Sequence, residues 1–300
     1  MRAVIASLLL ILLMVGCGPG RVDAPSVQEL ANATYSGIFE EPLTMTDGKW
    51  EGEPYATGGA SRPAAGLVDG FRLTGDLNQD GAEEAVVLLW SSSGGSGTFD
   101  YIALMGFGRE GEVLDLATVP LGDRVQLRSA HLLEGRVELD LIQAGPEDAA
   151  CCPGQKVKSI IVLAENGQVE ITTEDQGRLS LADLAGNWAL TRFSRDEPVS
   201  QDFEFTLQFD GKRVGGKAAC NVYTARIGEG EGPGEVSLTR PSAMTRMICP
   251  TEYMAAEKRY LKTLQMVTSF SFQAGKLMLH WRQEEDAGTL VFNSYEAGSE

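Results

Sequence analysis

Short runs of apolar and β-branched residues, bounded by Gly, Asn or Asp, follow one another along most of the chain. Runs of this length between turn residues predict β-strands. In the first half we expect strands at residues 71–74, 85–90, 99–105, 112–118, 125–132, 137–142, 157–162 and 169–172. In the second half we expect them at residues 188–192, 203–209, 213–215, 221–227, 235–238, 270–272, 276–281 and 289–292. The pattern therefore predicts a mainly β fold.

The period becomes helical between residues 250 and 266. Apolar residues recur there at the spacing of one helical face, namely Met254, Tyr260, Leu261 and Leu264. Pro250 suits the first turn of such a helix. Residues 27–33 predict one or two further helical turns near the start of the folded part.

A polar segment at residues 174–178 divides the strand pattern, which begins again at Leu179. Domain boundaries fall in polar segments of this kind. We therefore expect two domains, with the boundary near residue 177. Residues 35–176 form an N-terminal antiparallel all-β domain, and residues 177–300 form a second β domain with one helix.

The first residues have the layout of a bacterial lipoprotein signal. Arg2 precedes an apolar run at residues 3–15, which is followed by Gly16 and Cys17. The run is shorter than the roughly 20 residues that span a membrane as a helix. We expect residues 1–16 to be a signal peptide, Cys17 to carry the lipid, and residues 17–34 to be a tether. The alternative is an ordinary secretory signal that is cut between residues 16 and 20.

The location that follows is the cell envelope, with the membrane as a partner through the lipid on Cys17. Resemblance to bacterial lipoproteins implies that Gly18, which is not acidic, favours the outer membrane facing the periplasm in a cell that has two membranes. The formal net charge of −17 argues against nucleic acid as a partner, because phosphate binding needs a basic surface. The same charge opposes adhesion to anionic lipid, so the lipid would be the main membrane contact.

A candidate calcium loop lies between two expected strands of the first half. Oxygen ligands would come from alternate positions, namely Asp76, Asn78, Asp80, the carbonyl of Ala82, and Glu84. A glycine at the sixth position permits the tight turn that such loops need. Val87 stands at the twelfth position, where an EF-hand has glutamate, so a calcium-binding β-hairpin loop fits better. The alternative is an exposed acidic turn.

Four cysteines remain when Cys17 carries the lipid, and an oxidising compartment favours disulfides between them. We expect Cys220 and Cys249 to pair, because both lie in the second domain. The alternatives are two free thiols or a Cu(I) site made by Cys249 with Met244 and Met247. Cys151 and Cys152 could form a vicinal disulfide, bond to a distant cysteine, or serve a redox role.

The second half contains Cys220-Asn221-Val222-Tyr223 and then Met244-Thr245-Arg246-Met247-Ile248-Cys249, within an ordered series of segments from Leu184 to Phe292. In these motifs and their order, the chain from about Leu179 to Phe292 resembles the META/HslJ-like domain. One departure is Ala219, where the family is expected to have glycine. The resemblance implies a curved, partly open β-barrel with a helix packed across it, found in envelope lipoproteins. It also implies association with heat-shock response and novobiocin tolerance, without an established enzymatic activity.

These observations predict a non-enzymatic envelope lipoprotein. It would be a binding module for another envelope protein or a small ligand, or a module of the stress response. Neither His131 nor His280 has a partner at a spacing that predicts zinc binding or a catalytic triad. Two alternatives stay open. One is an envelope enzyme that uses acidic residues of the first domain, and the other is a purely structural spacer stabilised by calcium.

Overall fold

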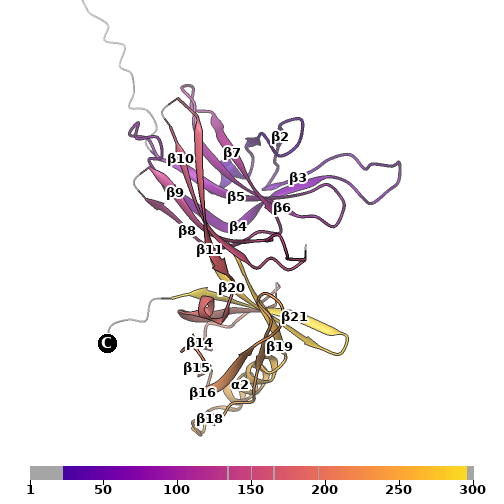
Figure 1. Ribbon diagram of the computed structural model, residues 1–300, viewed down its shortest axis with the longest axis vertical. Helices are drawn as coiled ribbons and strands as arrows, with labels where there is room; N and C mark the ends of the chain where they lie inside the picture. The colour runs from indigo at the N-terminus through magenta and orange to yellow at the C-terminus, as the bar shows by residue number, and fades with distance from the viewer. Residues whose placement is uncertain (1–22, 134, 150, 165, 195, 296–300) are drawn as a thin grey trace, which may run out of the picture.

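A computed structural model describes residues 23–133, 135–149, 151–164, 166–194 and 196–295 (Figure 1). The predicted lipid site Cys17 lies outside these residues. The protein is mainly β, as expected, and every strand pair is antiparallel. No helix within the described residues is long and apolar enough to cross a membrane.

The N-terminal half contains two main sheets. The five-stranded sheet has the order β3 (Lys49–Glu51), β4 (Ala64–Gly75), β5 (Glu84–Ser92), β6 (Phe99–Phe107) and β7 (Val113–Asp123). The four-stranded sheet has the order β11 (Val169–Arg178), β10 (Gln155–Leu163), β9 (Arg136–Gln143) and β8 (Gln126–Leu133). The short elements α1 (Val27–Leu30), β1 (Thr34–Tyr35) and β2 (Leu43–Thr44) precede them.

β5 and β6 are the centre of this half because both of their faces are buried. On one face, Val86, Leu88 and Ile102 pack against side chains of the four-stranded sheet. On the other face, Val87 and Ala103 pack against α1 and the β1–β2 ribbon. Burial on both faces explains why the sequences of these two strands are continuously apolar and do not alternate between apolar and polar residues.

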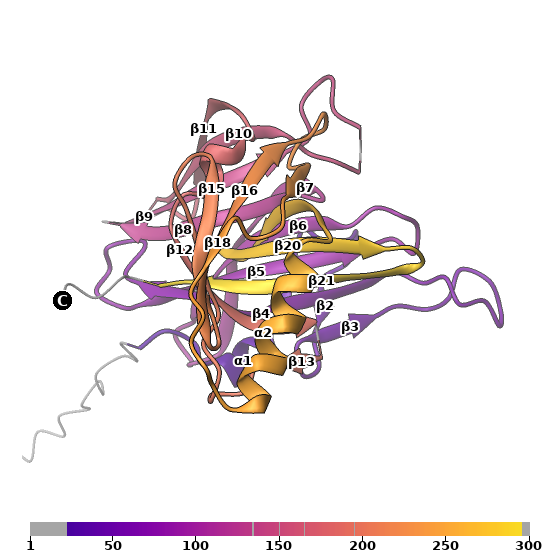
Figure 2. The same ribbon diagram turned by 90° about the horizontal axis from the view of Figure 1, so that it is seen from below.

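The C-terminal half is one curled sheet (Figure 2). Its order is β17 (Val236–Leu238), β16 (Asn221–Glu229), β15 (Arg213–Ala218), β14 (Thr206–Phe209), β12 (Asn187–Ser194), β21 (Asp286–Ser294), β20 (Lys276–Gln283) and β19 (Val267–Gln273). The strands β13 (Glu197–Pro198) and β18 (Ala243–Met244) pair beside this path. The two end strands approach each other, since Phe270 N donates to Gly234 O at 2.8 Å. The sheet is therefore a nearly closed barrel, as the resemblance implied.

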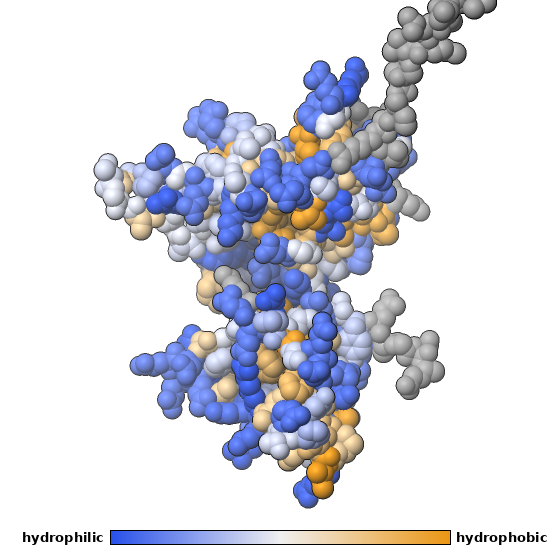
Figure 3. All heavy atoms as spheres, turned by 180° about the vertical axis from the view of Figure 1, so that it is seen from behind, coloured by the Kyte–Doolittle hydropathy of each residue, from blue (hydrophilic) through white to orange (hydrophobic). Residues whose placement is uncertain are grey.

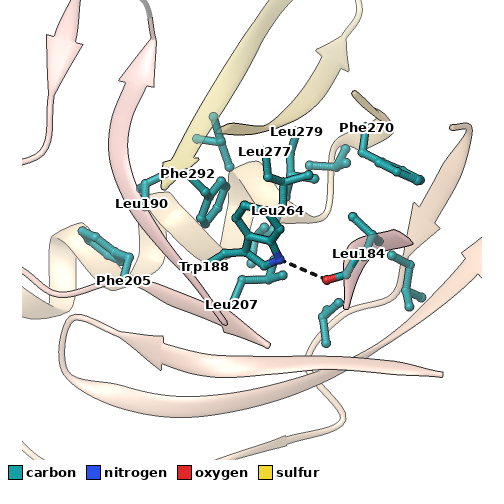
Figure 4. Close-up of a cluster of buried hydrophobic side chains, with 14 of the residues drawn as sticks. Leu184, Trp188, Leu190, Phe205, Leu207, Leu264, Phe270, Leu277, Leu279 and Phe292 are labelled. Carbon is teal, nitrogen blue, oxygen red and sulfur yellow. Dashed lines mark hydrogen bonds between the residues drawn. The ribbon is translucent and has the colours of Figure 1, made fainter. Parts of the chain in front are cut away.

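The core of the barrel is built around Trp188, which follows the 3-10 turn η1 (Leu181–Leu184). Its indole N–H donates to Leu184 O at 3.0 Å, and the ring packs among aliphatic and aromatic side chains (Figure 4). The helix α2 (Thr251–Leu264) packs against this core. The Tyr260 hydroxyl lies 3.0 Å from that of Tyr223, and both lie within hydrogen-bonding distance of Thr206 O.

One part of the helix prediction is wrong. Met254 was expected on the buried face, but half of its surface is exposed. The residues that face the core instead begin with Tyr253 and Ala256 and continue to Tyr260 and Leu264. Met254 lies one position beyond this stripe, so the helical spacing was correct and the centre of its apolar face was misplaced.

The two halves touch along β8 and β19. Phe272 N donates to Gln126 Oε1 at 2.9 Å, and Gly275 N donates to Leu127 O at 3.0 Å. The segment 174–178, expected as a polar break, is the end of β11 and is exposed. Its polar composition therefore reflects an exposed strand. The boundary near residue 177 stays a prediction.

Candidate functional site

The acidic loop, residues 76–84, joins β4 to β5 and folds around its own carboxylates. Asp76 accepts hydrogen bonds from Asp80 N at 3.1 Å and from Gly81 N at 3.0 Å. The Asp80 carboxylate accepts from Ala82 N at 2.8 Å. Gly81 has a φ of 91°, in the left-handed region that glycine adopts without strain. The loop is thus a tight, ordered turn.

Glu84 gives this loop its unusual electrostatics. Only 3% of Glu84 is exposed. Its carboxylate accepts from Leu77 N at 2.7 Å and from the Asn78 amide at 3.4 Å. Burial raises the pKa of Glu84, these hydrogen bonds partly oppose the rise, and the charges of Asp80 and Asp76 add to it. Negative charge is therefore crowded around a buried carboxylate.

The structure gathers the predicted calcium ligands in one turn. Their present contacts are not those of a formed metal site, because the oxygens of Asp76 and Asp80 accept backbone N–H groups. Within the described part of the chain, no group of three or more His, Cys, Asp or Glu side chains is arranged to hold a metal ion. The donor types suit calcium, which takes carboxylate, amide and carbonyl oxygens.

Cys151 and Cys152 lie next to each other at disulfide distance, with a Cα–Cα separation of 3.8 Å. Both are exposed in the loop between β9 and β10. Asp148 shapes this loop by accepting from Gly154 N at 2.9 Å and pairing with Arg178, and these contacts hold the pKa of Asp148 well below its usual range. The adjacent cysteines thus sit at the surface of a braced loop.

Three carboxylates of the N-terminal half have raised pKa values, and they do not converge. Asp100 pairs with Trp90 near the end of β5, whereas Glu84 stands at its beginning. Asp115 aligns with Met105 on the face that packs against α1 and β1. Strand alternation places Glu84 on the opposite face of the sheet. The raised pKa values therefore mark three separate acids rather than a catalytic pair.

The Cys220–Cys249 pair organises one end of the curled sheet. The two sulfurs lie at disulfide distance, and the Cα atoms are 6.0 Å apart. Asn221 holds the loop between them, because its Oδ1 accepts from Met247 N at 2.8 Å and from the Thr245 hydroxyl at 2.9 Å. The copper alternative requires a Cys249 thiolate, which a Cys220–Cys249 disulfide would not leave.

The turn before Cys220 shows why glycine is expected at position 219. Ala219 has a φ of 56°, so it adopts the left-handed conformation in which glycine is usual. The sequence from Ala219 to Cys249 contains this turn, the strands β16, β17 and β18, and the loop that leads to Cys249. Comparison with known families supports the resemblance seen in the sequence, since residues 179–294 match the META domain. The C-terminal half contains a META domain.

The match does not extend to the N-terminal half. No curated protein and no solved structure matches the chain. The META domain points to a stress-related or envelope module.

The META domain exposes apolar side chains around its disulfide loop. We call them the tip surface: Val222, Met244, Met247, Ile248 and Met254. Ile248 is 97% exposed, and the other four are between 44% and 56% exposed. Figure 3 shows apolar residues gathered at the end of the molecule away from the N-terminal sheets. Sequence reasoning missed this surface, although Met244, Met247 and Ile248 lie in a segment without strand or helical period.

Proposed function

We propose that the chain is a non-enzymatic module of the cell envelope, anchored through a lipid on Cys17, and that its META domain docks another envelope protein through the tip surface. The observation that supports this proposal is the exposure of five large apolar side chains on the segments around the disulfide loop. Exposed apolar patches are rare on monomeric proteins and commonly mark interaction sites.

The backbone under the tip surface is held in place before any partner arrives. The disulfide fixes Cys249 to Cys220, and Asn221 fixes Met247 N and Thr245. A preorganised loop loses little conformational entropy on binding. The flexible methionine side chains can adapt to an apolar partner surface. This combination suits a docking surface better than a mobile loop would.

A protein partner suits the placement of the tip surface better than the anchoring membrane does. The chain that leads to the expected lipid enters through the N-terminal half, where Arg72 binds the carbonyls of Ala24 and Pro25 and Leu30 is buried. β18 lies at the far end of the META domain from this entry (Figure 1). The tip surface would therefore face away from the membrane that holds the anchor.

Binding is favoured over catalysis in this proposal because the acids with raised pKa values do not share a cleft. Glu84 and Asp115 are on opposite faces of one sheet, and Asp100 is at its other end. General acid–base catalysis needs groups within hydrogen-bond reach of one reacting centre. The tip surface, in contrast, needs no further group to act.

The docking proposal is tested by photo-crosslinking in intact cells. A photoreactive residue is placed at position 248 or, as a matched control, at position 171, because Ile171 is an exposed apolar residue of the N-terminal half. We expect a specific partner to crosslink at 248 and not at 171, and the yield to fall in the Cys17→Ser variant. Equal crosslinking at both positions, or no discrete product at 248, would overturn the proposal.

We also propose that the acidic loop binds a structural calcium ion. The supporting observation is the crowding of Asp76 and Asp80 around the buried Glu84, whose pKa is raised partly by their charges. A divalent cation would remove this repulsion. Its affinity would lie near the roughly 10⁻⁴ to 10⁻³ M of extracellular calcium modules.

The calcium prediction is checked by thermal unfolding of the full chain with and without the ion. About 5 mM Ca²⁺, which is above the expected dissociation constant, should raise the Tm because only the folded loop presents all of the ligands. Asp80→Ala should abolish the rise. Asp69→Ala, which removes an exposed carboxylate of β4, should keep it. An unchanged Tm in the unmodified chain would exclude the site.

A further inference from the structure

Two adjoining hollows lie on the outer face of the META sheet. One of about 670 Å³ is lined by Lys212, Arg213 and Arg226. The other, of about 530 Å³, is lined by Asn187, Gln208 and Thr224 among others. Asp210 and Arg213 line both hollows. These exposed residues alternate along β15 and β16 with buried ones such as Val214 and Ala225, so the hollows face solvent.

The first hollow concentrates positive charge on a strongly acidic protein. Arg213 and Arg226 are directly opposite each other on β15 and β16. Like charges in such a cross-strand pair are destabilising unless something compensates them. Asp210 pairs with Arg213 at 3.1 Å. Within the described part of the chain, neither Arg226 nor Lys212 is ion-paired to a carboxylate. Two cations in this hollow are therefore left for an external anion.

The META domain has a much smaller net negative charge than the first half, which favours a site for an anion. Residues 1–178 hold 26 acidic and 12 basic residues, whereas residues 179–300 hold 16 acidic and 13 basic ones. An anionic ligand approaching the META sheet therefore meets much weaker general repulsion than it would at the N-terminal half. Nucleic acid remains a poor candidate because this local patch is too small to follow a phosphate backbone.

The second hollow adds neutral polar groups next to the arginines. The side chains of Asn187, Gln208 and Thr224 make no hydrogen bond to other described residues, so they are available to a ligand. Gly215 also lines this hollow, and a side chain there would be crowded, because its Cβ would lie only 3.0 Å from Tyr223 O. The ring of Phe209 packs against the core on the other face of the sheet. Exposed amide and hydroxyl groups suit the hydroxyls of a sugar.

We propose that the two hollows form one binding site for an acidic saccharide. A carboxylate or phosphate of the ligand binds Arg226 and Lys212, and the guanidinium group of Arg226 gives charge-assisted, bidentate hydrogen bonds. The hydroxyls of the adjoining sugar meet Asn187, Gln208 and Thr224. This site is formed by β12, β14, β15 and β16 and does not depend on the docking of a protein at the tip surface.

The test is calorimetric titration of the detergent-solubilised full chain with trigalacturonate and with galactotriose, its neutral counterpart. We expect trigalacturonate to bind at least about tenfold more tightly, because only it presents carboxylates to Arg226 and Lys212. Arg226→Ala should weaken its binding by about tenfold to a hundredfold, the usual cost of losing hydrogen bonds to a charged group. Gln208→Ala should weaken the binding of both trisaccharides, because both present hydroxyls to this side chain.

Lys217→Ala is the matched control, because Lys217 is another accessible cation of β15 but pairs with Glu204 at 2.7 Å. Its trigalacturonate affinity should be unchanged. Equal binding of the two trisaccharides, or binding that survives Arg226→Ala, would overturn the proposal, as would no binding of trigalacturonate up to about 10 mM, the limit of weak specific affinity. Inorganic phosphate that binds as tightly as trigalacturonate would overturn the saccharide assignment. Circular dichroism confirms that each variant is folded.

Discussion

At the residue scale, Asn221 links the buried core of the META domain to its tip surface. Only 4% of its surface is exposed. Its backbone N–H donates to Glu257 on α2 at 2.8 Å, while its side chain accepts from Met247 N and the Thr245 hydroxyl. One side chain thus fixes the helix, the strand and the loop together. A rigid loop can hold apolar side chains in water that a mobile loop would fold inward.

Asp100 makes stability depend on pH. Burial raises its pKa to about 7, the charge of Asp123 adds to the rise, and a hydrogen bond from Val125 N opposes it. The unfolded carboxyl titrates near its ordinary value of 3.8. Between about pH 4 and pH 7 the folded chain therefore keeps a proton that the unfolded chain has lost. Its contribution to stability is present below pH 4 and is lost as the pH rises to 7.

Asp100→Asn should remove this loss of stability at high pH, because asparagine carries no charge. We expect the variant to exceed the unmodified chain in free energy of unfolding by about 1–2 kcal/mol at pH 8. This is less than the full value of the pKa shift because the side chain is partly solvated. Urea unfolding at pH 5 and pH 8 measures it. Asp69→Asn, at an exposed position of β4, serves as the control. A pH profile unchanged by Asp100→Asn would contradict the role of Asp100.

Residue-level predictions from the sequence succeed where the partners are near in the chain. The acidic loop could be predicted because its members lie within nine positions. The role of Asn221 could not, because its partners are 24 to 36 positions away. The tip surface escaped prediction because an apolar residue in a loop can be buried or exposed, and only the packed structure decides between them.

At the element scale, the sequence predicts strands well where burial is strong. The runs at 85–90 and 99–105 fall within β5 and β6, whose apolar side chains fill both adjoining cores. β4 begins at Ala64 rather than at 71, because its first part contains small residues and an irregular pairing between Leu67 and Arg72. β11 continues to Arg178 although it has almost no buried side chain.

The shortest strands were missed for a different reason. β1, β2 and β3 have two or three residues each, which is too few to show an alternating pattern. They exist because of their partners, as in the pairing of Tyr35 with Leu43, and because those two side chains are buried in the core beneath β5 and β6. Strands of this length depend on tertiary packing rather than on local sequence.

The disulfide loop of the META domain makes a testable contribution to stability. Cys220 and Cys249 are 29 positions apart, and closing a loop of this length stabilises a fold by about 3–4 kcal/mol in the chain-entropy model. The Cys220→Ala/Cys249→Ala variant should lose about this much free energy of unfolding in urea. Cys151→Ala/Cys152→Ala should change it by less than about 1 kcal/mol, because adjacent residues enclose almost no chain. Equal losses in the two variants would contradict the prediction.

At the scale of the whole molecule, a buried acid joins the two halves. Asp183 of η1 is 4% exposed. It pairs with Lys156 of β10 at 3.0 Å and with Arg128 of β8 at 3.8 Å, and it accepts from Ser180 N at 2.9 Å. A META residue is thus held by two cations of the N-terminal half. This contact was not predictable, because the sequence does not show which faces of two domains meet.

Asp183→Ala tests whether this contact couples the halves. Removing the buried carboxylate leaves Lys156 and Arg128 without this partner, and because both cations are partly exposed the cost should be below the about 3–5 kcal/mol of a fully buried ion pair. We expect scanning calorimetry to show two separated transitions in the variant, with the META transition at the lower temperature. Glu197→Ala removes a half-exposed ion pair with Arg259 inside the META domain and should cost less than about 1 kcal/mol. A single transition at an unchanged temperature in Asp183→Ala would exclude the coupling.

The arrangement as a whole places the expected lipid anchor at one end and the tip surface, for which we propose a docking role, at the other. The most direct test measures how much chain is recovered in a covalent complex after mild chemical crosslinking of intact envelopes. Ile248→Glu should reduce the fraction in the complex by at least about tenfold, because a charge buried in an apolar contact is costly. Ile171→Glu, at an exposed apolar position of the N-terminal half, should leave the fraction unchanged. Recovery of the same complex from Ile248→Glu and from the unmodified chain would contradict docking through the tip surface.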